Sequence, residues 1–125
     1  MAKKKIISKS ELLCKTIVEG MQEVKAKDIV ILDLRNVSSA VCDFFVICTG
    51  DSNTQVDGIS SSVNRYTRKQ IQDKPWRIEG KQNREWILMD YVDVVVHVFY
   101  KETRAFFELE ELWADAVRTD IPNLN

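Results

Sequence analysis

Residues 86–100 have the sequence Trp-Ile-Leu-Met-Asp-Tyr-Val-Asp-Val-Val-Val-His-Val-Phe-Tyr. β-Branched and aromatic residues dominate this segment, and its two charged residues, Asp90 and Asp93, lie near its centre. This composition is typical of two β-strands joined by a tight turn. If Tyr91 and Val92 form a two-residue loop, the hairpin places Asp90 directly opposite Asp93.

The two faces of this predicted hairpin differ in character, because successive side chains point to opposite sides of a strand. One face carries Trp86, Leu88, Asp90, Asp93, Val95 and His97. The other carries Ile87, Met89, Val94, Val96, Val98 and Tyr100. Like charges that face each other across a hairpin repel, and a cationic partner would relieve this repulsion. A face that combines a tryptophan, a histidine and two unpaired carboxylates therefore has the composition of a binding site for such a partner. The alternative is a core tryptophan, a solvated aspartate turn and a hydrogen-bonded sheet histidine. A register shift of one residue would exchange the faces.

Length and composition indicate one domain, residues 1–125 with a core of about residues 8–118. Hydrophobic residues make up 45% of the chain, which is enough for a core without disulfides. Eighteen basic and nineteen acidic residues give a net charge of −1, which argues against a general polyanion binder. Acids concentrate between residues 86 and 115, and this bias suits a basic protein partner. The alternative is that the charges mark solvated helix faces.

The three cysteines, Cys14, Cys42 and Cys48, are odd in number and form no C-x-x-C motif. This pattern fits a reducing cytosol and gives no metal or redox signature. The sequence shows no signal peptide and no apolar run long enough to span a membrane. We therefore expect a cytoplasmic protein without a membrane partner.

Helical periodicity predicts three helices. The first begins at Ser10 as N-cap, and the second follows residues 49–53. The third begins at Glu102 or Thr103, and residues 120–125 form a tail. The expected inner stripe of the first helix is Leu13, Ile17, Met21 and Val24. That of the second is Val56, Ile59, Val63 and Tyr66. That of the third is Phe106, Leu109, Leu112, Trp113 and Val117.

Apolar runs at residues 28–34 and 43–49 predict two buried strands, and residues 76–79 predict a short edge strand. With the hairpin, this order gives an α/β or α+β domain. Its mixed β-sheet has about five strands and flanking helices.

The sequence offers little support for catalysis or for a cofactor. A single histidine without a nucleophile motif argues against a hydrolase triad, and scattered cysteines argue against a zinc site. Asp90 and Asp93 could hold a metal ion for phosphoryl transfer. However, the turn at residues 49–53 has one glycine and no phosphate-binding motif.

Several motifs resemble the ribosomal silencing factor family (RsfS, or Iojap-like proteins). The similarity rests on the run from Trp86 to Val98, followed by Arg104, Phe107, Glu108-Leu109-Glu110 and Leu112-Trp113. Earlier matches are Asp33-Leu34, Ser38-Ser39, Asp43-Phe44 and Ile47-Cys48-Thr49-Gly50-Asp51-Ser52. The resemblance extends from the first helix to Trp113, and its most specific part joins the hairpin pattern to the last helix.

The resemblance implies a non-enzymatic factor with a nucleotidyltransferase-like fold that lacks the catalytic carboxylates. Such factors bind the large ribosomal subunit at ribosomal protein L fourteen, block subunit joining and repress translation, and members often form homodimers when free. The resemblance implies no cofactor, no metal and no sequence-specific nucleic-acid binding. Its implied partner contacts are Trp86, Asp90, Asp93, His97, Phe107 and Glu110. The alternative is a metal-dependent nucleotidyltransferase-like enzyme.

Four positions depart from the pattern of the family. Thr54-Gln55 occupy the place of an Arg-His pair, and Val92 occupies a turn position that often carries glycine. A tight hairpin turn favours positive φ at such a position, so the loop is expected to be wider or of another type. Phe107 replaces a common tyrosine, which keeps the ring and removes the hydroxyl.

Overall fold

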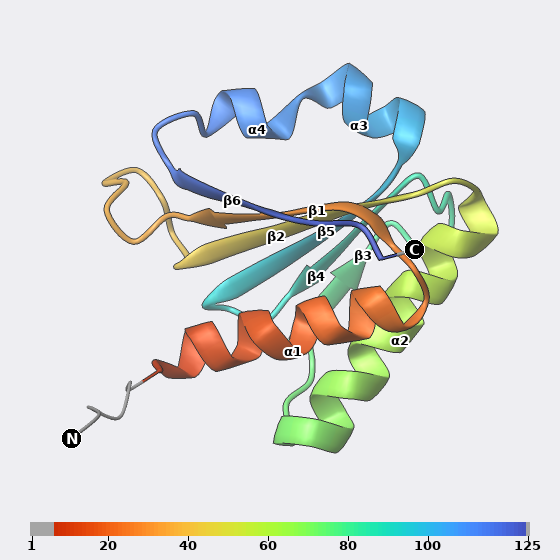
Figure 1. The fold of residues 1–125 in the computed structure, drawn as a ribbon, viewed down its shortest axis with the longest axis horizontal. Coiled ribbons are helices and arrows are strands. Elements are labelled where there is room, and N and C mark those ends of the chain that lie inside the picture. The colour runs from red at the N-terminus through yellow and green to blue at the C-terminus, as the bar shows by residue number, and fades with distance from the viewer. Residues whose placement is uncertain (1–6, 125) are drawn as a thin grey trace.

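The computed structural model describes residues 7–124, which form a mixed sheet of six strands with helices on both faces (Figure 1). The strands are β1 (Lys27–Asp33), β2 (Phe44–Gly50), β3 (Arg77–Glu79), β4 (Trp86–Asp90), β5 (Val94–Tyr100) and β6 (Val117–Ile121). The helices are α1 (Lys9–Glu23), α2 (Asn53–Ile71), α3 (Lys101–Phe107) and α4 (Leu109–Leu112). The spatial order of the strands is β3-β4-β5-β2-β1-β6. Strands β2 and β5 run parallel, and the other neighbours are antiparallel. The predicted fold class is confirmed.

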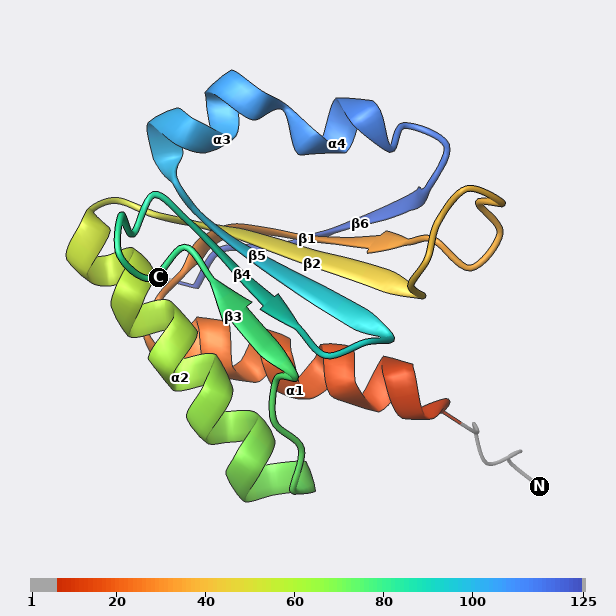
Figure 2. The same cartoon turned by 180° about the vertical axis from the view of Figure 1, so that it is seen from behind.

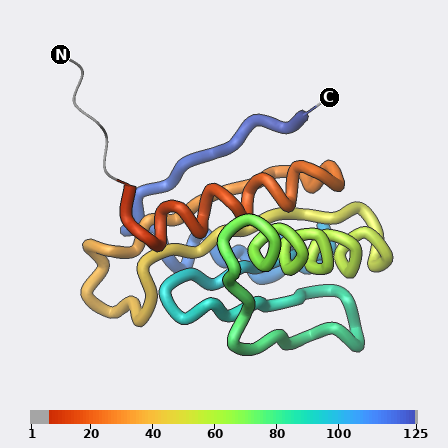
Figure 3. The backbone as a smooth tube through the Cα atoms, turned by 90° about the horizontal axis from the view of Figure 1, so that it is seen from below, coloured from red at the N-terminus to blue at the C-terminus, as the bar shows by residue number. Residues whose placement is uncertain are grey.

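The first hydrophobic core lies between the sheet and the pair α1 and α2, which run side by side beneath it (Figure 3). Gly20 allows the two helices to approach, since a Cβ atom there would lie 3.0 Å from the Cα of Val63. The buried Ser62 hydroxyl donates a 2.7 Å hydrogen bond to the Gly20 carbonyl. The predicted apolar face of the β4–β5 hairpin supplies Ile87, Met89, Val94, Val96 and Val98 to this core.

The register of the hairpin corrects the prediction. Trp86 lies opposite Phe99, and Asp90 lies opposite Val95. This register differs from the predicted one by two residues, so each strand residue keeps its predicted face. Asp93 does not pair in the hairpin, because its carbonyl accepts hydrogen bonds from the backbone N–H groups of residues 43 and 44, at 2.8 and 3.2 Å. A contact with the start of β2 therefore sets the turn.

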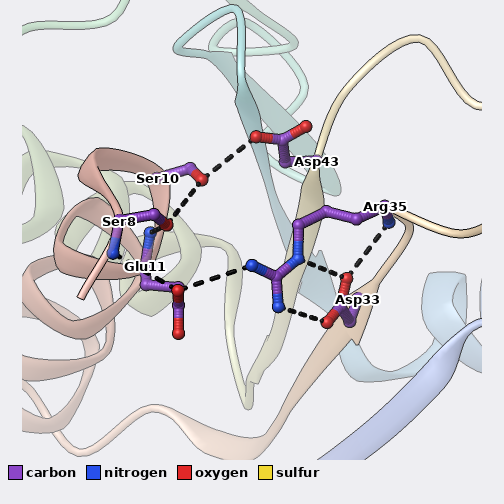
Figure 4. A network of polar contacts seen from close by, with 6 residues as sticks. All are labelled: Ser8, Ser10, Glu11, Asp33, Arg35 and Asp43. Atoms are coloured by element: carbon purple, nitrogen blue, oxygen red, sulfur yellow. Dashed lines mark hydrogen bonds and ion pairs between the residues drawn. The ribbon is translucent and has the colours of Figure 1, made fainter. Parts of the chain in front are cut away.

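The start of α1 is the centre of a polar network (Figure 4). Ser8, and not the predicted Ser10, is the N-cap, and it forms a capping box with Glu11. The Ser10 hydroxyl instead donates to the Asp43 carboxylate at 3.0 Å. Arg35 donates to the Glu11 carboxylate at 3.4 Å. These bonds join the first helix to the loop that connects β1 and β2.

The carboxy-terminal part of the chain also differs from the prediction of one helix and a tail. Glu108 has φ 48°, and this left-handed residue separates α3 from α4. Residues 117–121 form β6, which pairs antiparallel with β1. The backbone hydrogen bonds that residues 117–121 form with the edge of β1 stabilise a strand there more than the helical spacing of the apolar residues stabilises a helix. Of the predicted inner residues, Leu109 is buried, whereas Phe106, Leu112 and Val117 are exposed.

Within residues 7–124, no helix is both long enough and apolar enough to cross a membrane.

Val92 adopts a backbone conformation that β-branched residues rarely adopt. Its φ is 77°, and the N–H of Asp93 donates to the carbonyl of Tyr91 at 3.0 Å, as in a γ-turn. We predict that Val92→Gly raises the free energy of unfolding by about 1 kcal/mol, because glycine relieves the strain. Urea denaturation measures this change. Val41→Gly, at an exposed residue without positive φ, is the control and should not stabilise the protein.

Candidate functional site

The second face of the sheet is only partly covered (Figure 2). A second hydrophobic core lies beneath α3 and α4 and contains Val30, Leu32, Leu34, Ile47, Phe99 and Leu109. These buried residues come mainly from β1, β2 and β5. On this face of the neighbouring β4, the side chains of Trp86, Leu88 and Asp90 are half-buried. The margin of the second core is therefore an accessible surface.

Arg104 fixes α3 and α4 to the sheet. Its guanidinium donates to the Asp28 carbonyl at 2.6 Å, to the Thr49 hydroxyl at 2.8 Å and to the Glu110 carboxylate at 3.2 Å. The side chains of Arg104 and Glu110 are 11% and 18% exposed. Glu110, a predicted partner contact, thus has one carboxylate oxygen, Oε2, bound to Arg104, while Oε1 is buried without a hydrogen-bond partner among residues 7–124.

Trp86 and His97 are joined by a hydrogen bond inside the second face. The indole Nε1–H donates to His97 Nδ1 at 3.1 Å. The imidazole is buried and packs edge-on against the Phe45 ring at 4.6 Å. Burial lowers the pKa of His97 to about 3, so the ring is neutral at physiological pH. Since Nδ1 accepts, the proton of the neutral ring is assigned to Nε2, for which residues 7–124 provide no hydrogen-bond partner.

The indole of Trp86 also connects the core to the surface. Its ring lies 4.7 Å from the buried Phe99 ring and 4.9 Å from the Phe107 ring, between centroids. Phe107 is 46% exposed, and the neighbouring Phe106 is 80% exposed. We call Trp86, Phe106 and Phe107 the aromatic ledge. This apolar surface is anchored to the sheet by the hydrogen bond from Trp86 to the buried His97.

The two aspartates of the hairpin lie beside this face in different settings. Asp90 accepts a 2.8 Å hydrogen bond from the N–H of Val92, and its other carboxylate oxygen lies 3.9 Å from the Arg77 guanidinium. Asp93 is exposed in the turn. Both are carboxylates at the surface, and Asp90 also supports the turn.

The alternative of a metal site finds little geometric support. Both carboxylate oxygens of Asp90 face donors of the protein itself. Across residues 7–124, no group of three or more His, Cys, Asp or Glu side chains is arranged to hold a metal ion. The start of α2 is likewise satisfied from within the chain. Ser52 caps it, and Gln55 accepts from the N–H of Asp51 at 2.7 Å.

The six residues predicted to contact a partner differ in exposure. Asp93 and Phe107 are exposed, Trp86, Asp90 and Glu110 are half-buried, and His97 is buried. Leu88 lies on the same face as Trp86, as the alternation along β4 predicts, but it was not among the predicted partner contacts. Phe106 was expected in the core and is exposed, because no local pattern predicts that the helix breaks at Glu108.

Comparison with known proteins assigns a family to this arrangement. The family described as "Ribosomal silencing factor during starvation" matches residues 7–125. The chain belongs to the ribosomal silencing factor family. It is 39% identical to "Ribosomal silencing factor RsfS" of Halalkalibacterium halodurans over 116 residues, covering 92% of this chain and 96% of the relative. The resemblance inferred from the sequence is therefore confirmed.

A solved structure and a more distant relative are also similar to this chain, as expected for a member of the ribosomal silencing factor family. A crystal structure of a Chromobacterium violaceum protein matches with a TM-score of 0.79 and 33% identity, covering 86% of this chain and 88% of that chain. A mouse relative named "Mitochondrial assembly of ribosomal large subunit protein 1" is 29% identical over 99 residues, covering 78% of this chain and 43% of the relative. The family is one of ribosome-associated factors.

The buried neutral histidine makes stability depend on pH. Its pKa in the folded state lies below the ordinary value of 6.5, so the unfolded chain binds a proton more readily. We predict that the free energy of unfolding falls by about 2 kcal/mol between pH 7 and pH 5. His97→Gln keeps an acceptor for Trp86 and does not titrate, so it should lose most of this dependence. Urea denaturation at several pH values measures the free energy of unfolding of the parent and the variant. If this free energy fell equally with decreasing pH in both proteins, the prediction would be wrong.

The Arg104 contacts require a guanidinium. We predict that Arg104→Lys lowers the free energy of unfolding by about 2 kcal/mol, because one ammonium cannot reach all three acceptors. Thermal and urea denaturation measure the loss. Arg118→Lys is the matched control, since Arg118 is exposed and its one ion pair among the described residues is with Asp120, and it should change stability by less than about 0.5 kcal/mol.

Proposed function

We propose that this chain binds the large ribosomal subunit through ribosomal protein L fourteen and sterically prevents the small subunit from joining, which represses translation. The contact surface is the aromatic ledge together with Asp90 and Asp93. One observation carries the proposal: a hydrogen bond to the buried His97 holds the Trp86 indole at the margin of the sheet, beside the exposed Phe107 ring and on the same strand as Asp90.

The composition of this surface suits a basic protein partner. Interface energy concentrates in large anchors such as tryptophan that lie near the centre of the contact and exclude water. Trp86 and Phe107 provide that anchor. Asp90 and Asp93, at the other end of the β4–β5 hairpin, provide negative charge that would steer a lysine- or arginine-rich surface into register. The family name and the mouse relative's name both point to ribosomal particles as partners.

His97 and Glu110 act on the partner through other residues. His97 orients the indole by accepting its N–H, and Glu110 holds α3 in place through Arg104. We therefore propose that these two residues position the surface and do not themselves contact the ribosomal protein.

The proposed action is steric and non-enzymatic, in the cytoplasm. Occupying the surface needs no cofactor and no bond making, and the two hairpin aspartates serve as recognition charges. A homodimer of the free protein would bury the same aromatic ledge, because exposed apolar rings favour self-association.

The double variant Trp86→Ala/Asp93→Lys tests the contact surface. Loss of an anchor typically costs 2 kcal/mol or more, so we predict at least a roughly 30-fold weaker affinity for purified large subunits. Sedimentation through a sucrose cushion measures binding, and circular dichroism checks that the variant is folded. Light scattering after addition of small subunits should show that the parent, and not the variant, blocks joining.

The control is Glu19→Lys, which makes the same charge change at an exposed residue of α1, on the opposite face of the sheet. It should bind as the parent does. If the folded double variant bound large subunits as tightly as the parent, the assigned surface would be wrong.

A further inference from the structure

A short basic segment contrasts with the acidic remainder of the chain. Between Asp57 and Glu79 the sequence contains five basic residues and a single acid, Asp73. The bases are Arg65, Arg68, Lys69, Lys74 and Arg77. The first three recur on one exposed face of α2, opposite the stripe that packs on the sheet, and the last two lie in and after the loop to β3. The Arg77 guanidinium lies 3.5 Å from a Glu79 oxygen and 3.9 Å from an Asp90 oxygen, so the other four bases form the local positive patch on this chain of net charge −1.

An exposed indole lies within this patch. Trp76 is 74% exposed, and the Arg77 guanidinium lies over its ring at 5.7 Å from the centroid. Its backbone N–H donates to the Asp90 carbonyl at 2.7 Å, so the hairpin holds the residue in place. The exposed indole and the guanidinium therefore lie together on one surface of the molecule.

A groove separates this indole from the hairpin turn. Its lining includes Arg68, Gln72, Lys74, Trp76, Tyr91 and Val92. Tyr91 gives it a rigid wall, because its hydroxyl shares a buried 2.9 Å hydrogen bond with Thr67. Asp73 also lines the groove, and its carboxylate accepts from the N–H of Lys74 at 2.9 Å. The groove thus combines an aromatic face with more positive than negative charge.

We propose that Trp76 and the surrounding bases bind unpaired RNA, with a base stacked on the indole and phosphates held by Arg68 and Lys74. Exposed aromatic rings and basic side chains on one surface are the features by which proteins hold single strands without reading sequence. An acidic protein would satisfy the charges, but it would leave the planar indole without a planar partner.

This inference rests on the proposed function, because it assigns a second contact to the same bound particle. The groove adjoins the hairpin turn, with Val92 in its lining and Asp90 bonded to Trp76. A large subunit presents RNA next to its proteins. One docking event would therefore place the aromatic ledge on protein and Trp76 on RNA.

The test measures fluorescence anisotropy of a fluorescein-labelled twelve-nucleotide oligo(U) with the full chain. A single-strand contact with about two phosphates predicts a roughly 7-fold loss of affinity between 50 and 200 mM salt. Trp76→Ala should weaken binding roughly 5- to 100-fold and keep this salt dependence, and Trp76→Phe should restore part of the loss. Arg68→Glu/Lys74→Glu should flatten the salt dependence. A duplex RNA of equal length should bind more weakly.

Lys15→Glu is the matched control, because Lys15 is an exposed base on α1 outside the segment, and it should bind oligo(U) as the parent does. Equal binding by the parent and Trp76→Ala, or no binding by the parent at 50 mM salt, would overturn the inference. This assay contains no ribosomes, so its failure leaves the docking of the aromatic ledge intact. Conversely, a failure of subunit sedimentation with intact oligo(U) binding would count against the proposed function alone.

Discussion

The hydrogen bond from the Trp86 indole to His97 determines the surface on which the rest of this account depends. An indole N–H at the edge of a core needs an acceptor, and His97 supplies one only while its ring is neutral. Burial on β5, one of the two central strands, keeps it neutral. The indole is therefore held with one side against Phe99 and another against Phe107. The contacts with His97, Phe99 and Phe107 therefore fix the orientation of the indole within the chain itself, before any partner binds.

A second constraint is the short covering of this face. The chain has two helices of ordinary length beneath the sheet, and above it α3 and α4 are broken at Glu108 and tied down by Arg104. Because this cover is small, it buries the β1, β2 and β5 part of the face and leaves the β4 margin open. The aromatic ledge exists because of that incomplete cover.

Much of the fold could be predicted from the sequence, because helices and strands follow from the spacing of apolar residues along the chain. Alternation in residues 86–100 assigned the strand side chains to their faces even though the register was wrong by two residues. The register itself depends on the contact of Asp93 with the start of β2, which no local pattern encodes. β6 was missed for the same reason: residues 117–121 become a strand only because β1 has a side available for pairing. Trp76 was expected as an edge-strand residue, but its exposure beside Arg77 required coordinates.

Hydrogen–deuterium exchange of the chain bound to purified large subunits can locate the surface that contacts the ribosome. If that surface is the aromatic ledge with the hairpin turn, amides of residues 90–93 and of α3 will exchange more slowly in the complex than in the free chain. Amides of α1, on the opposite face of the sheet, should exchange at an unchanged rate. Protection confined to α1, with the turn and α3 exchanging as in the free chain, would contradict the account.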